Sequence, residues 1–220
     1  TDTEPLARLI LRSEALASSR IEGLEMSARK LLEYEALDSL GISHRLDSTE
    51  AAVLGNINAM QQGIAAGMAQ SELDMQLICH VNQQLLSGTS MSEYAGIIRT
   101  DQNWIGGNNA NPVGAAYVPP KPEYVPSLLE DLLGFCNHSD LPALAIAAIA
   151  HAQLETIHPF ADGNGRTGRA LIHIILKRSG LAPSVVPPVS LILATDKERY
   201  INHLMAFRFD SKETPSADPL

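Results

Sequence analysis

A twelve-residue polar loop between two apolar segments constrains the fold of this chain more than any other feature. The segment Pro142–Ile157 is rich in alanine and apolar on nearly all sides, and Ala170–Leu176 is apolar as well. A helix that is apolar all round belongs at the centre of a domain. We therefore expect the two segments to form the innermost helices, joined by the loop that runs from His158 to Arg169.

This 158–169 loop reads His-Pro-Phe-Ala-Asp-Gly-Asn-Gly-Arg-Thr-Gly-Arg. The run Gly163-Asn164-Gly165 can reach backbone angles that are closed to most residues, so its amides can turn toward an anion. A helix that starts directly after it would add free N–H groups and a positive dipole end. Arg166 and Arg169 share one face of that helix, and their forked donors suit phosphate oxygens.

Two further residues of the loop add chemistry to this anion site. Asp162 supplies a hard oxygen ligand beside the nest, which suits Mg²⁺ that bridges phosphates. His158 is the group of the loop that titrates near neutral pH, so it is the candidate general base. A plain glycine-rich connector would need neither group. The loop therefore predicts a site for a polyphosphate and a metal, with a base at its edge.

The loop resembles the signature of the Fic family, His-Pro-Phe-x-(Asp/Glu)-Gly-Asn-Gly-Arg-x-x-Arg, and matches it at every specified position. The resemblance implies an all-α fold, a helical bundle with a small β-hairpin flap beside the active site. It implies transfer of AMP from ATP to a Tyr, Thr or Ser hydroxyl of a target protein, with His158 as base and Mg²⁺ on Asp162. It assigns nucleotide binding to Gly163, Asn164, Gly165, Arg166 and Arg169.

A second part of the resemblance lies in the first helix, which we expect from Glu4 to Glu22. Its last turn, from Ser18 to Gly23, matches (Ser/Thr)-x-x-x-Glu-(Gly/Asn), which marks an inhibitory helix in Fic proteins. The resemblance implies that Glu22 pairs with Arg169 and withholds this arginine from the γ-phosphate of ATP. The alternative is that Glu22 is an exposed residue near a helix end, with Ser18 solvated.

Helical periodicity is lost between Gly88 and Pro122, where glycine, asparagine and proline recur. Short β-prone pieces in this stretch resemble the Fic flap, at about residues 97–118. In that family the flap edge captures a target protein as an added strand. The implied docking residues are Trp104, Ile105, Gly106, Gly107, Tyr117 and Val118. The alternative for the two aromatic residues is that they only pack the loop against the body.

The rest of the chain is predicted to be helical. We divide the whole chain into an N-terminal helical region (1–90), a Fic core (91–210) and a polar tail (211–220). One helix is expected to be capped by Ser48 or Thr49 and ended by Gly67, and another to start at Ser71. These two helices are predicted at Ser48–Ala66 and Ser71–Leu86. The further helices are predicted at Ser27–Leu40, Glu123–Asn137, Gly165–Ser179 and Val189–Phe207.

Composition narrows the class of partners. The net charge of −9 and the pI of about 5.2 argue against a broad nucleic-acid-binding surface. No stretch approaches 18 consecutive apolar residues, so we expect no membrane contact. Cys79 and Cys136 fit buried thiols of a cytoplasmic protein. The residues His151, Glu155 and His158 do not follow the His-Glu-x-x-His pattern of zinc peptidases, so His151 is taken as a core histidine.

Three other functions stay open at this point. The chain could remove AMP from a modified protein, or transfer a different phosphate-containing group. It could also be a nucleotide-sensing regulatory module of a longer, DNA-binding protein. Self-modification and a homodimer are likewise compatible with the sequence.

Overall fold

The computed structural model describes residues 4–42, 45–108 and 110–208. Within these residues the chain forms nine α-helices and two short 3₁₀ turns and has no regular sheet, so the predicted all-α fold is confirmed. The elements are α1 (Glu4–Ile21), α2 (Ala28–Ser39), α3 (Ser48–Ala69), α4 (Met75–Leu86), η1 (Ser92–Tyr94), η2 (Pro122–Tyr124), α5 (Val125–His138), α6 (Ala143–Ile157), α7 (Asn164–Arg178), α8 (Val189–Thr195) and α9 (Lys197–Phe207).

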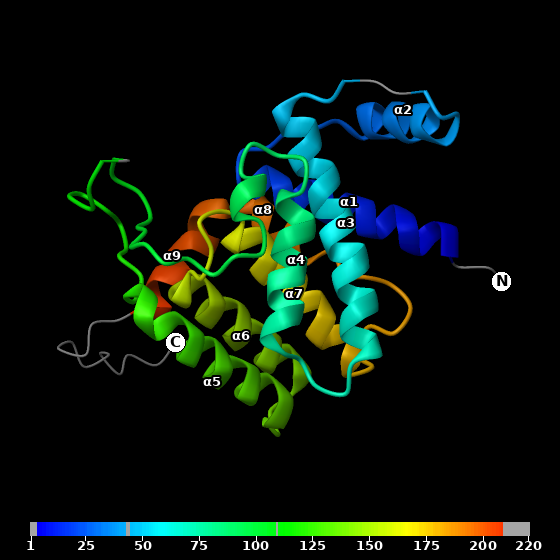
Figure 1. The fold of residues 1–220 in the computed structure, drawn as a ribbon. Helices are drawn as coiled ribbons and strands as arrows, with labels where there is room; N and C mark the ends of the chain where they lie inside the picture. Colours follow the sequence, from blue (N-terminus) through cyan, green and yellow to red (C-terminus); the bar gives the residue numbers. More distant parts are fainter. Residues whose placement is uncertain (1–3, 43–44, 109, 209–220) are drawn as a thin grey trace.

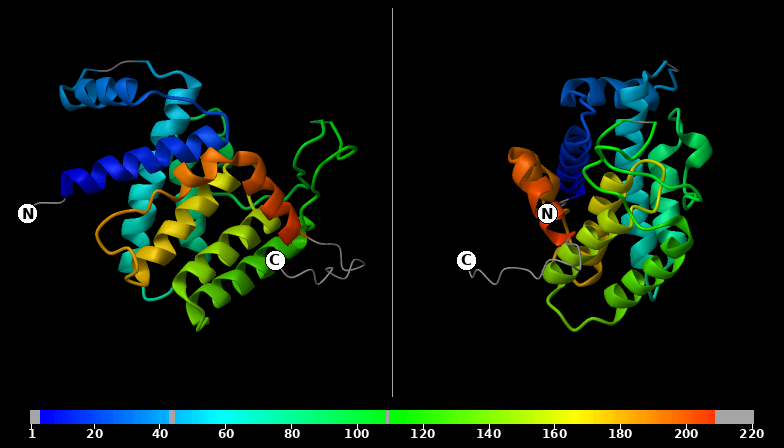
Figure 2. Two further views of the ribbon diagram at one scale, coloured as in Figure 1. Left: turned by 180° about the vertical axis from the view of Figure 1, so that it is seen from behind. Right: turned by 90° about the vertical axis from the view of Figure 1, so that its left-hand side faces the viewer.

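Helix α7 is the centre of the bundle, as its apolar sequence predicts. All its residues from Arg166 to Leu176 are buried. It packs against α3, α4 and α6, while α1 crosses the bundle and contacts α3 and α8 (Figure 1). Helix α2 lies at the edge of the bundle, away from this centre (Figure 2). Residues 158–163 join α6 and α7, and the rest of the 158–169 segment forms the first turns of α7, so the core fixes both ends of the segment.

Helix α3 continues past Gly67, where the sequence analysis ends it. A β-carbon on Gly67 would lie 2.5 Å from Cγ2 of Ile174, and one on Gly63 would lie 2.7 Å from Cγ2 of Val81. A β-carbon on Gly55 would collide with the carbonyl oxygen of Leu85. These glycines therefore let α4 and α7 approach α3 closely, and the prediction that Gly67 ends the helix is wrong.

Two helix starts also differ from the prediction. Asp47 caps α3, because its Oδ1 accepts the backbone N–H of Glu50 at 2.8 Å while Glu50 accepts the N–H of Asp47 at 2.9 Å. Asp74 caps α4 by accepting the N–H of Leu77 at 2.8 Å. The capping roles given to Ser48, Thr49 and Ser71 are therefore wrong. In both cases an aspartate close by, a stronger N-cap than threonine and equal to serine, takes the position.

The expected single closing helix Val189–Phe207 is two helices. Asp196 has the non-helical angles φ −141° and ψ 72°, and its carboxylate accepts the N–H of Arg199 at 3.0 Å. It therefore starts a new helix, α9, instead of continuing α8. The break turns α9 so that it contacts α6.

The flap (residues 97–118, without residue 109) contains one antiparallel bridge, Ile105–Tyr117, in place of a regular β-hairpin. The N–H of Ile105 donates to the carbonyl of Tyr117 at 2.9 Å, and that of Ala116 donates to the carbonyl of Ile105 at 2.8 Å. Gly106 and Gly107 follow with φ of 77° and 71° and turn the chain away, so the ladder cannot continue. In Figure 1 the flap projects from the side of the bundle.

The described helices include none that is long and apolar enough to cross a lipid bilayer. The polar tail predicted at residues 211–220 lies outside the described residues. The division of the chain near residue 90 stays a prediction.

Candidate functional site

Contacts within the 158–169 loop, between its own side chains and backbone, hold the loop in one conformation. His158 ends α6 in the left-handed region, at φ 50° and ψ 61°, a conformation that only a firmly held non-glycine residue keeps. Phe160 is fully buried, and its backbone N–H and C=O both bond to the side-chain amide of Asn164 at 2.9 Å. Both polar atoms of the Asn164 side chain thus hold the loop in shape.

Two residues outside the loop fix it from the other side. Arg99, at the start of the flap, donates from Nε to the carbonyl of His158 at 2.8 Å. Asn82 of α4 donates to the carbonyl of Asp162 at 3.0 Å and accepts the N–H of Gly96 at 3.0 Å. Sequence reasoning missed both residues, because each acts on a segment that is distant in the chain. They tie the loop to the flap and to α4.

The N-terminus of α7 faces the loop without a side-chain cap. Gly163 is the N-cap residue, in the left-handed region at φ 79°, and no side chain accepts a hydrogen bond from the first turn. A β-carbon on Gly163 would meet Leu85 and Asn82, so glycine is required here for space as well as for its backbone angles. The uncapped amides and the helix dipole give this end the features of the predicted anion-binding site.

Arg166 lies at this end with donors to spare. It is 4 % exposed, and its Nε and Nη1 are buried without a hydrogen-bond partner. Its Nη2 lies 3.6 Å from Oδ2 of Asp162, while Oδ1 of Asp162 accepts the N–H of Gly163 at 2.6 Å. Buried guanidinium donors are rarely left unpaired. An anionic ligand at the start of α7 would supply the missing acceptors.

Arg169, by contrast, has a hydrogen-bond partner at each of its three nitrogens. Its Nη2 donates to Oε1 of Glu22 at 2.6 Å and to the carbonyl of Ser18 at 3.0 Å. Its Nε donates to Oγ of Ser18 at 2.9 Å, and its Nη1 donates to the hydroxyl of Tyr200 at 3.4 Å. Glu22 therefore meets the arginine with which the resemblance pairs it. Ser18 of the same motif contacts this arginine as well, and it is buried rather than solvated.

The contact with Arg169 also changes the pKa of Glu22. Burial alone would raise its pKa, but the charge and the hydrogen bond of Arg169 outweigh burial, so the pKa of Glu22 is lowered. The more distant charges of Arg166 and Lys197 act in the same direction. The carboxylate is thus ionised at neutral pH and lies among the cations of the site.

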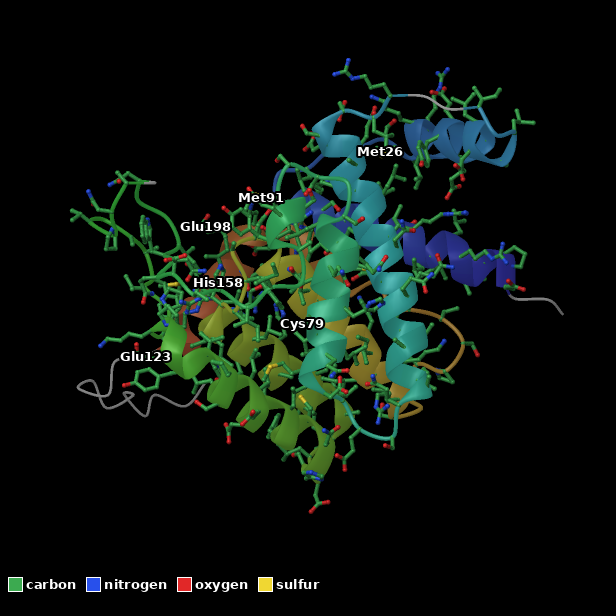
Figure 3. The ribbon with its side chains drawn as sticks, in the orientation of Figure 1. Met26, Cys79, Met91, Glu123, His158 and Glu198 are labelled. Carbon is green, nitrogen blue, oxygen red and sulfur yellow. The ribbon has the colours of Figure 1, made fainter. Side chains whose placement is uncertain are left out.

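His158 is the base candidate that the loop places in the cavity. Its side chain is 18 % exposed, and its Nδ1 lies 3.4 Å from the carbonyl oxygen of Glu155. Burial is the largest influence and lowers the pKa of His158 to about 4. The imidazole is therefore neutral at pH 7, and a proton on Nδ1 that faces this carbonyl leaves Nε2 free to accept one. Figure 3 labels His158 where α6 ends, beside the flap.

The two aromatic residues of the flap hold the flap itself in place. Trp104 donates from Nε1 to the carbonyl of Asn108 at 2.7 Å, within the flap. Tyr117 donates its hydroxyl to the carbonyl of Thr156 at 3.0 Å, and Arg208 lies over its ring at 4.4 Å. The contacts of Tyr117 agree with packing of the flap against the body, whereas the hydrogen bond of Trp104 stays within the flap.

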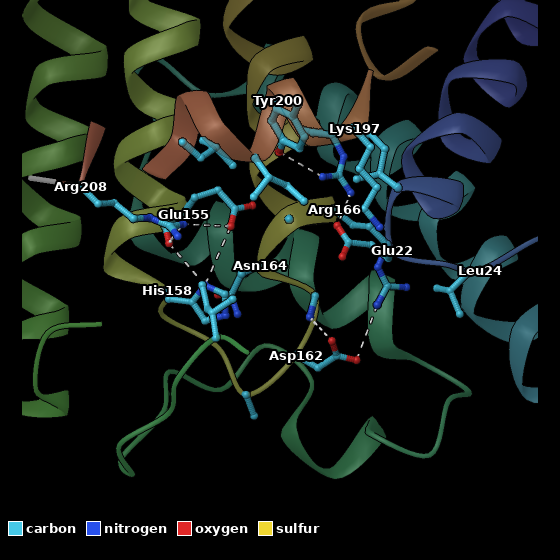
Figure 4. Close-up of a pocket in the computed structure, with 18 residues that line it drawn as sticks. Glu22, Leu24, Glu155, His158, Asp162, Asn164, Arg166, Lys197, Tyr200 and Arg208 are labelled. Atoms are coloured by element: carbon cyan, nitrogen blue, oxygen red, sulfur yellow. Dashed lines mark hydrogen bonds and ion pairs between the residues drawn. The ribbon is translucent and has the colours of Figure 1, made fainter. Parts of the chain in front are cut away.

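A cavity of about 500 Å³ brings the predicted residues together (Figure 4). Its wall includes Glu22, Ile105, His158, Asp162, Gly163, Asn164, Gly165, Arg166 and Arg169. The remaining predicted site residues are not part of this wall: Ser18 lies behind Arg169, and Trp104, Gly106, Gly107, Tyr117 and Val118 lie on the flap.

The cavity wall also contains residues that the sequence analysis gave no role in the site. Lys197, Tyr200 and Arg208 come from α9 and its end, and Glu155 comes from α6. His151 is a core residue, as predicted, and its Nε2 shares a hydrogen bond with the hydroxyl of Tyr200 at 2.8 Å. For these additional cavity residues, the sequence held one signal: Glu155 precedes His158 by one helical turn, so the two side chains share a face of α6.

Comparison with known proteins agrees with this site. The sequence profile described as "Fic/DOC family" matches residues 72–176, and the one described as "Fic/DOC family N-terminal" matches residues 1–65. The curated "Protein adenylyltransferase fic-1" of Caenorhabditis elegans is 35 % identical over 119 residues, which are 53 % of this chain and 22 % of the relative. "Protein adenylyltransferase Fic" of Drosophila willistoni is 32 % identical over 174 residues, 76 % of this chain and 32 % of the relative.

The chain thus spans about a third or less of these relatives. Among solved structures, a Fic family protein from Desulfovibrio desulfuricans superposes with a TM-score of 0.71 at 22 % identity. The match covers 93 % of this chain and 59 % of that one. A Fic domain containing signaling protein from Bacteroides thetaiotaomicron superposes with a TM-score of 0.67, at 87 % and 70 % coverage and 22 % identity. The fold is shared with both, and two family profiles account for most of the sequence: the chain belongs to the Fic/DOC family.

Proposed function

We propose that this chain is a protein adenylyltransferase, which moves AMP from ATP to a hydroxyl group of another protein, and that α1 inhibits it. The single observation that carries the proposal is the unpaired, buried guanidinium of Arg166 at the uncapped start of α7, beside the neutral imidazole of His158. The names of the relatives support the same activity.

The triphosphate of ATP fits the cationic end of the cavity. The backbone amides of Asn164 and Gly165 hold phosphate oxygens, joined by that of Gly163 once it leaves Oδ1 of Asp162, and the free donors of Arg166 bind the β-phosphate region. Arg169 orients the γ-phosphate once Glu22 releases it. These contacts turn the α-phosphorus toward the acceptor.

Asp162 is the metal ligand in this proposal. Its side chain is 48 % exposed and lies at the edge of the cavity. One carboxylate is what Mg²⁺ commonly takes from a protein when phosphates and water complete its shell, so the donor set fits. Mg²⁺ bound here would neutralise charge on the α- and β-phosphates of ATP.

His158 acts as the general base. Its Nε2 takes the proton of a Tyr, Thr or Ser hydroxyl while the hydroxyl oxygen forms a bond to the α-phosphorus. The bond from the α-phosphorus to the oxygen shared with the β-phosphate breaks, and pyrophosphate leaves with that electron pair. The products are the AMP-modified protein, pyrophosphate and a protonated His158.

The contact of Glu22 with Arg169 supports inhibition by α1. A γ-phosphate must replace both the carboxylate and the hydrogen bonds that this guanidinium makes to Ser18. Breaking the pair without a substitute would leave a buried unpaired cation, which is strongly unfavourable. The wild-type protein therefore binds ATP poorly or in an unproductive pose.

We place the target protein on the flap, as an added strand. Support comes from Ile105, which lines the cavity, and from Val118, which is 48 % exposed. A target strand along this edge would bring its hydroxyl to His158.

The partly buried free thiols Cys79 and Cys136 support a cytoplasmic location.

The test is incorporation of label from ATP labelled at the α-phosphate, with self-modification and lysate proteins as acceptors. We expect little label with the wild-type protein, strong labelling with Glu22→Gly, and a loss of about 10²–10⁴-fold in Glu22→Gly/His158→Ala. ATP labelled at the γ-phosphate should transfer none. Equal labelling by wild type and Glu22→Gly would refute inhibition by α1. Binding of ATP without transfer, even in Glu22→Gly, would favour the nucleotide-sensing module.

A further inference from the structure

Glu155 is a buried carboxyl group beside His158 that the proposed function leaves without a role. It lies on α6 one turn before His158, and its Oε2 is 3.9 Å from Nδ1 of the imidazole. Its own carbonyl oxygen is 3.4 Å from the same nitrogen. Glu155 therefore presents two acceptors to one side of the His158 ring, as Figure 4 shows.

The Glu155 carboxyl group lies in surroundings that are energetically unfavourable for it, because it is buried and one of its oxygens lacks a hydrogen-bond partner. The residue is 6 % exposed, and its Oε1 is buried without a hydrogen-bond partner. An unpaired buried oxygen of this kind destabilises the fold, so its presence calls for an explanation, and a functional role is one. Its location on the cavity wall, facing the base, points to such a function.

A cation at the end of α9 fixes Glu155 in this place. Arg208 donates from Nη2 to the carbonyl of Glu155 at 2.9 Å, and the same nitrogen lies 3.9 Å from its Oε2. The Arg208 guanidinium also covers the ring of Tyr117, so it connects Glu155 to the flap. The Glu155 carboxyl group thus lies close to both the His158 imidazole and the Arg208 guanidinium on the cavity wall (Figure 4).

We propose that Glu155 is a positioning residue for the transfer reaction, which holds the Nδ1–H side of His158 and stabilises the imidazolium that forms when Nε2 takes the acceptor proton. The inference rests on the proposed function. A carboxylate 3.9 Å from the ring balances the charge that develops on it, and this effect is larger inside a protein than in water. The proton taken by Nε2 leaves to solvent after pyrophosphate departs, so Glu155 itself is unchanged.

The ionisation of Glu155 gives this role a measurable pH dependence. Burial is the largest influence and raises its pKa to about 7, while Arg169 and Arg208 oppose this and Glu22 adds to it. The charged and titratable groups that face it from the neighbouring elements are Glu22, Arg169, His158, Tyr200 and Arg208. The ionised form is the active one, so transfer should rise with pH as Glu155 loses its proton.

Burial lowers the pKa of His158 to about 4, below the pKa of Glu155. Loss of the increase in Glu155→Gln, which keeps His158, is the result that assigns it to Glu155. In a protein without Glu22, the loss of the neighbouring negative charge moves this increase to lower pH, because that charge raises the pKa of Glu155.

The kinetic test compares Glu22→Gly with Glu22→Gly/Glu155→Gln, in a series of buffers from pH 5 to 8. Glutamine has the same shape as glutamate and cannot ionise. We expect kcat to fall by about 10- to 100-fold, KM for ATP to stay within about twofold, and the acidic limb of the pH profile to disappear. An unchanged kcat and pH profile would overturn the inference, and so would a rise in KM at unchanged kcat.

Glu22→Gly/Glu14→Gln is the matched control. Glu14 is a buried carboxylate, 1 % exposed, and it bonds to His173 and to the start of α8 rather than to His158. The control should keep the kcat and the acidic limb of Glu22→Gly. A control with the same changes as Glu155→Gln would mean that loss of any buried carboxylate produces them, which also overturns the inference.

A second measurement needs no transfer activity, so it separates this inference from the proposed function. In the wild-type protein with ¹⁵N-labelled histidine, the ring signals of His158, identified by their absence in His158→Ala, should shift with a midpoint near pH 7 as Glu155 ionises. In Glu155→Gln this midpoint should be absent. Identical titrations in the two proteins would overturn the inference, whereas a Glu22→Gly protein that transfers no label would refute the proposed function.

Discussion

Arg169 is the residue on which the two states of the site depend. It is 1 % exposed and donates to Ser18, Glu22 and Tyr200. Hydrogen bonds of a charged group contribute about 1.5–3 kcal/mol each, and leaving such a group buried without a partner costs more than one bond contributes. In the proposed function, an ATP γ-phosphate can therefore displace Glu22 only by replacing its charge, so we expect this single carboxylate to control the site.

Ser18 should share this control with Glu22. Its Oγ accepts the Nε–H of Arg169 at 2.9 Å, in a position without solvent access. Replacing it by alanine leaves Nε unpaired and weakens the docking of α1 by about 1–3 kcal/mol, while the pair with Glu22 remains. We expect Ser18→Ala to label acceptors more than wild type does and less than Glu22→Gly does, measured with ATP labelled at the α-phosphate.

Ser13→Ala is the control for this substitution. Ser13 lies on the same helix but is exposed, and its hydroxyl bonds to the carbonyl of Leu9. It should behave as wild type. If Ser18→Ala and Ser13→Ala gave the same labelling, the hydroxyl of Ser18 would have no part in inhibition.

At the scale of elements, the glycine-bearing face of α3 determines how closely α7 can be placed. A β-carbon at Gly67 would press on Ile174, which lies on α7 with Arg166 and Arg169. Arg178, at the end of α7, donates to the carbonyls of Gly67 and Gln70 and so fixes the same contact. The position of α7, and hence of the phosphate-binding end, depends on these small residues.

Substitution of Gly67 by alanine tests this contact. Alanine is the better helix former by about 0.8–1.0 kcal/mol, but overpacking in a tight core costs about 1–3 kcal/mol. We expect Gly67→Ala to lower the free energy of unfolding, measured by urea denaturation. Gly134→Ala in α5 is the control: a β-carbon there meets nothing within 4 Å, so it should raise this free energy by about 0.5–1 kcal/mol. Stabilisation by both substitutions would show that α3 and α7 have room to adjust.

Helix α9 shows how a short break in one element changes the site. Asp196 ends α8 and caps α9. The new helix then brings Tyr200 to Arg169 and carries Arg208, just beyond its end, to Glu155. Residues 196–199 form an exposed face, and Lys197 on that face also borders the cavity.

At the scale of the whole molecule, the sequence predicts what is contiguous in the chain better than what is distant. The 158–169 loop, the apolar helices on either side of it and the anion-binding start of α7 follow from residue type and spacing. The contact between Glu22 and Arg169 spans 147 residues and was accessible only through the resemblance to a known family. Glu155 and Arg208 meet because of how α6 and α9 pack, and no local pattern in the chain encodes this.

The errors have the same origin. Gly67 has the residue type of a helix end but is required for close packing. At the two helix starts the N-cap residue is a nearby aspartate instead of Ser48 or Ser71. The flap has β-prone residues but two glycines with positive φ limit it to one bridge. For Gly67 and the flap a tertiary or backbone constraint overrode a propensity, whereas at the two caps aspartate and serine have equal propensity and the sequence alone does not decide between them.

A crystal structure of Glu22→Gly with Mg²⁺ and a non-hydrolysable ATP analogue would test the central claim most directly. We predict density for the phosphates at the start of α7, with the γ-phosphate on Arg169, the β-phosphate region on Arg166 and the α-phosphorus turned toward Nε2 of His158. Nucleotide bound elsewhere, or no nucleotide at saturating concentration, would contradict it.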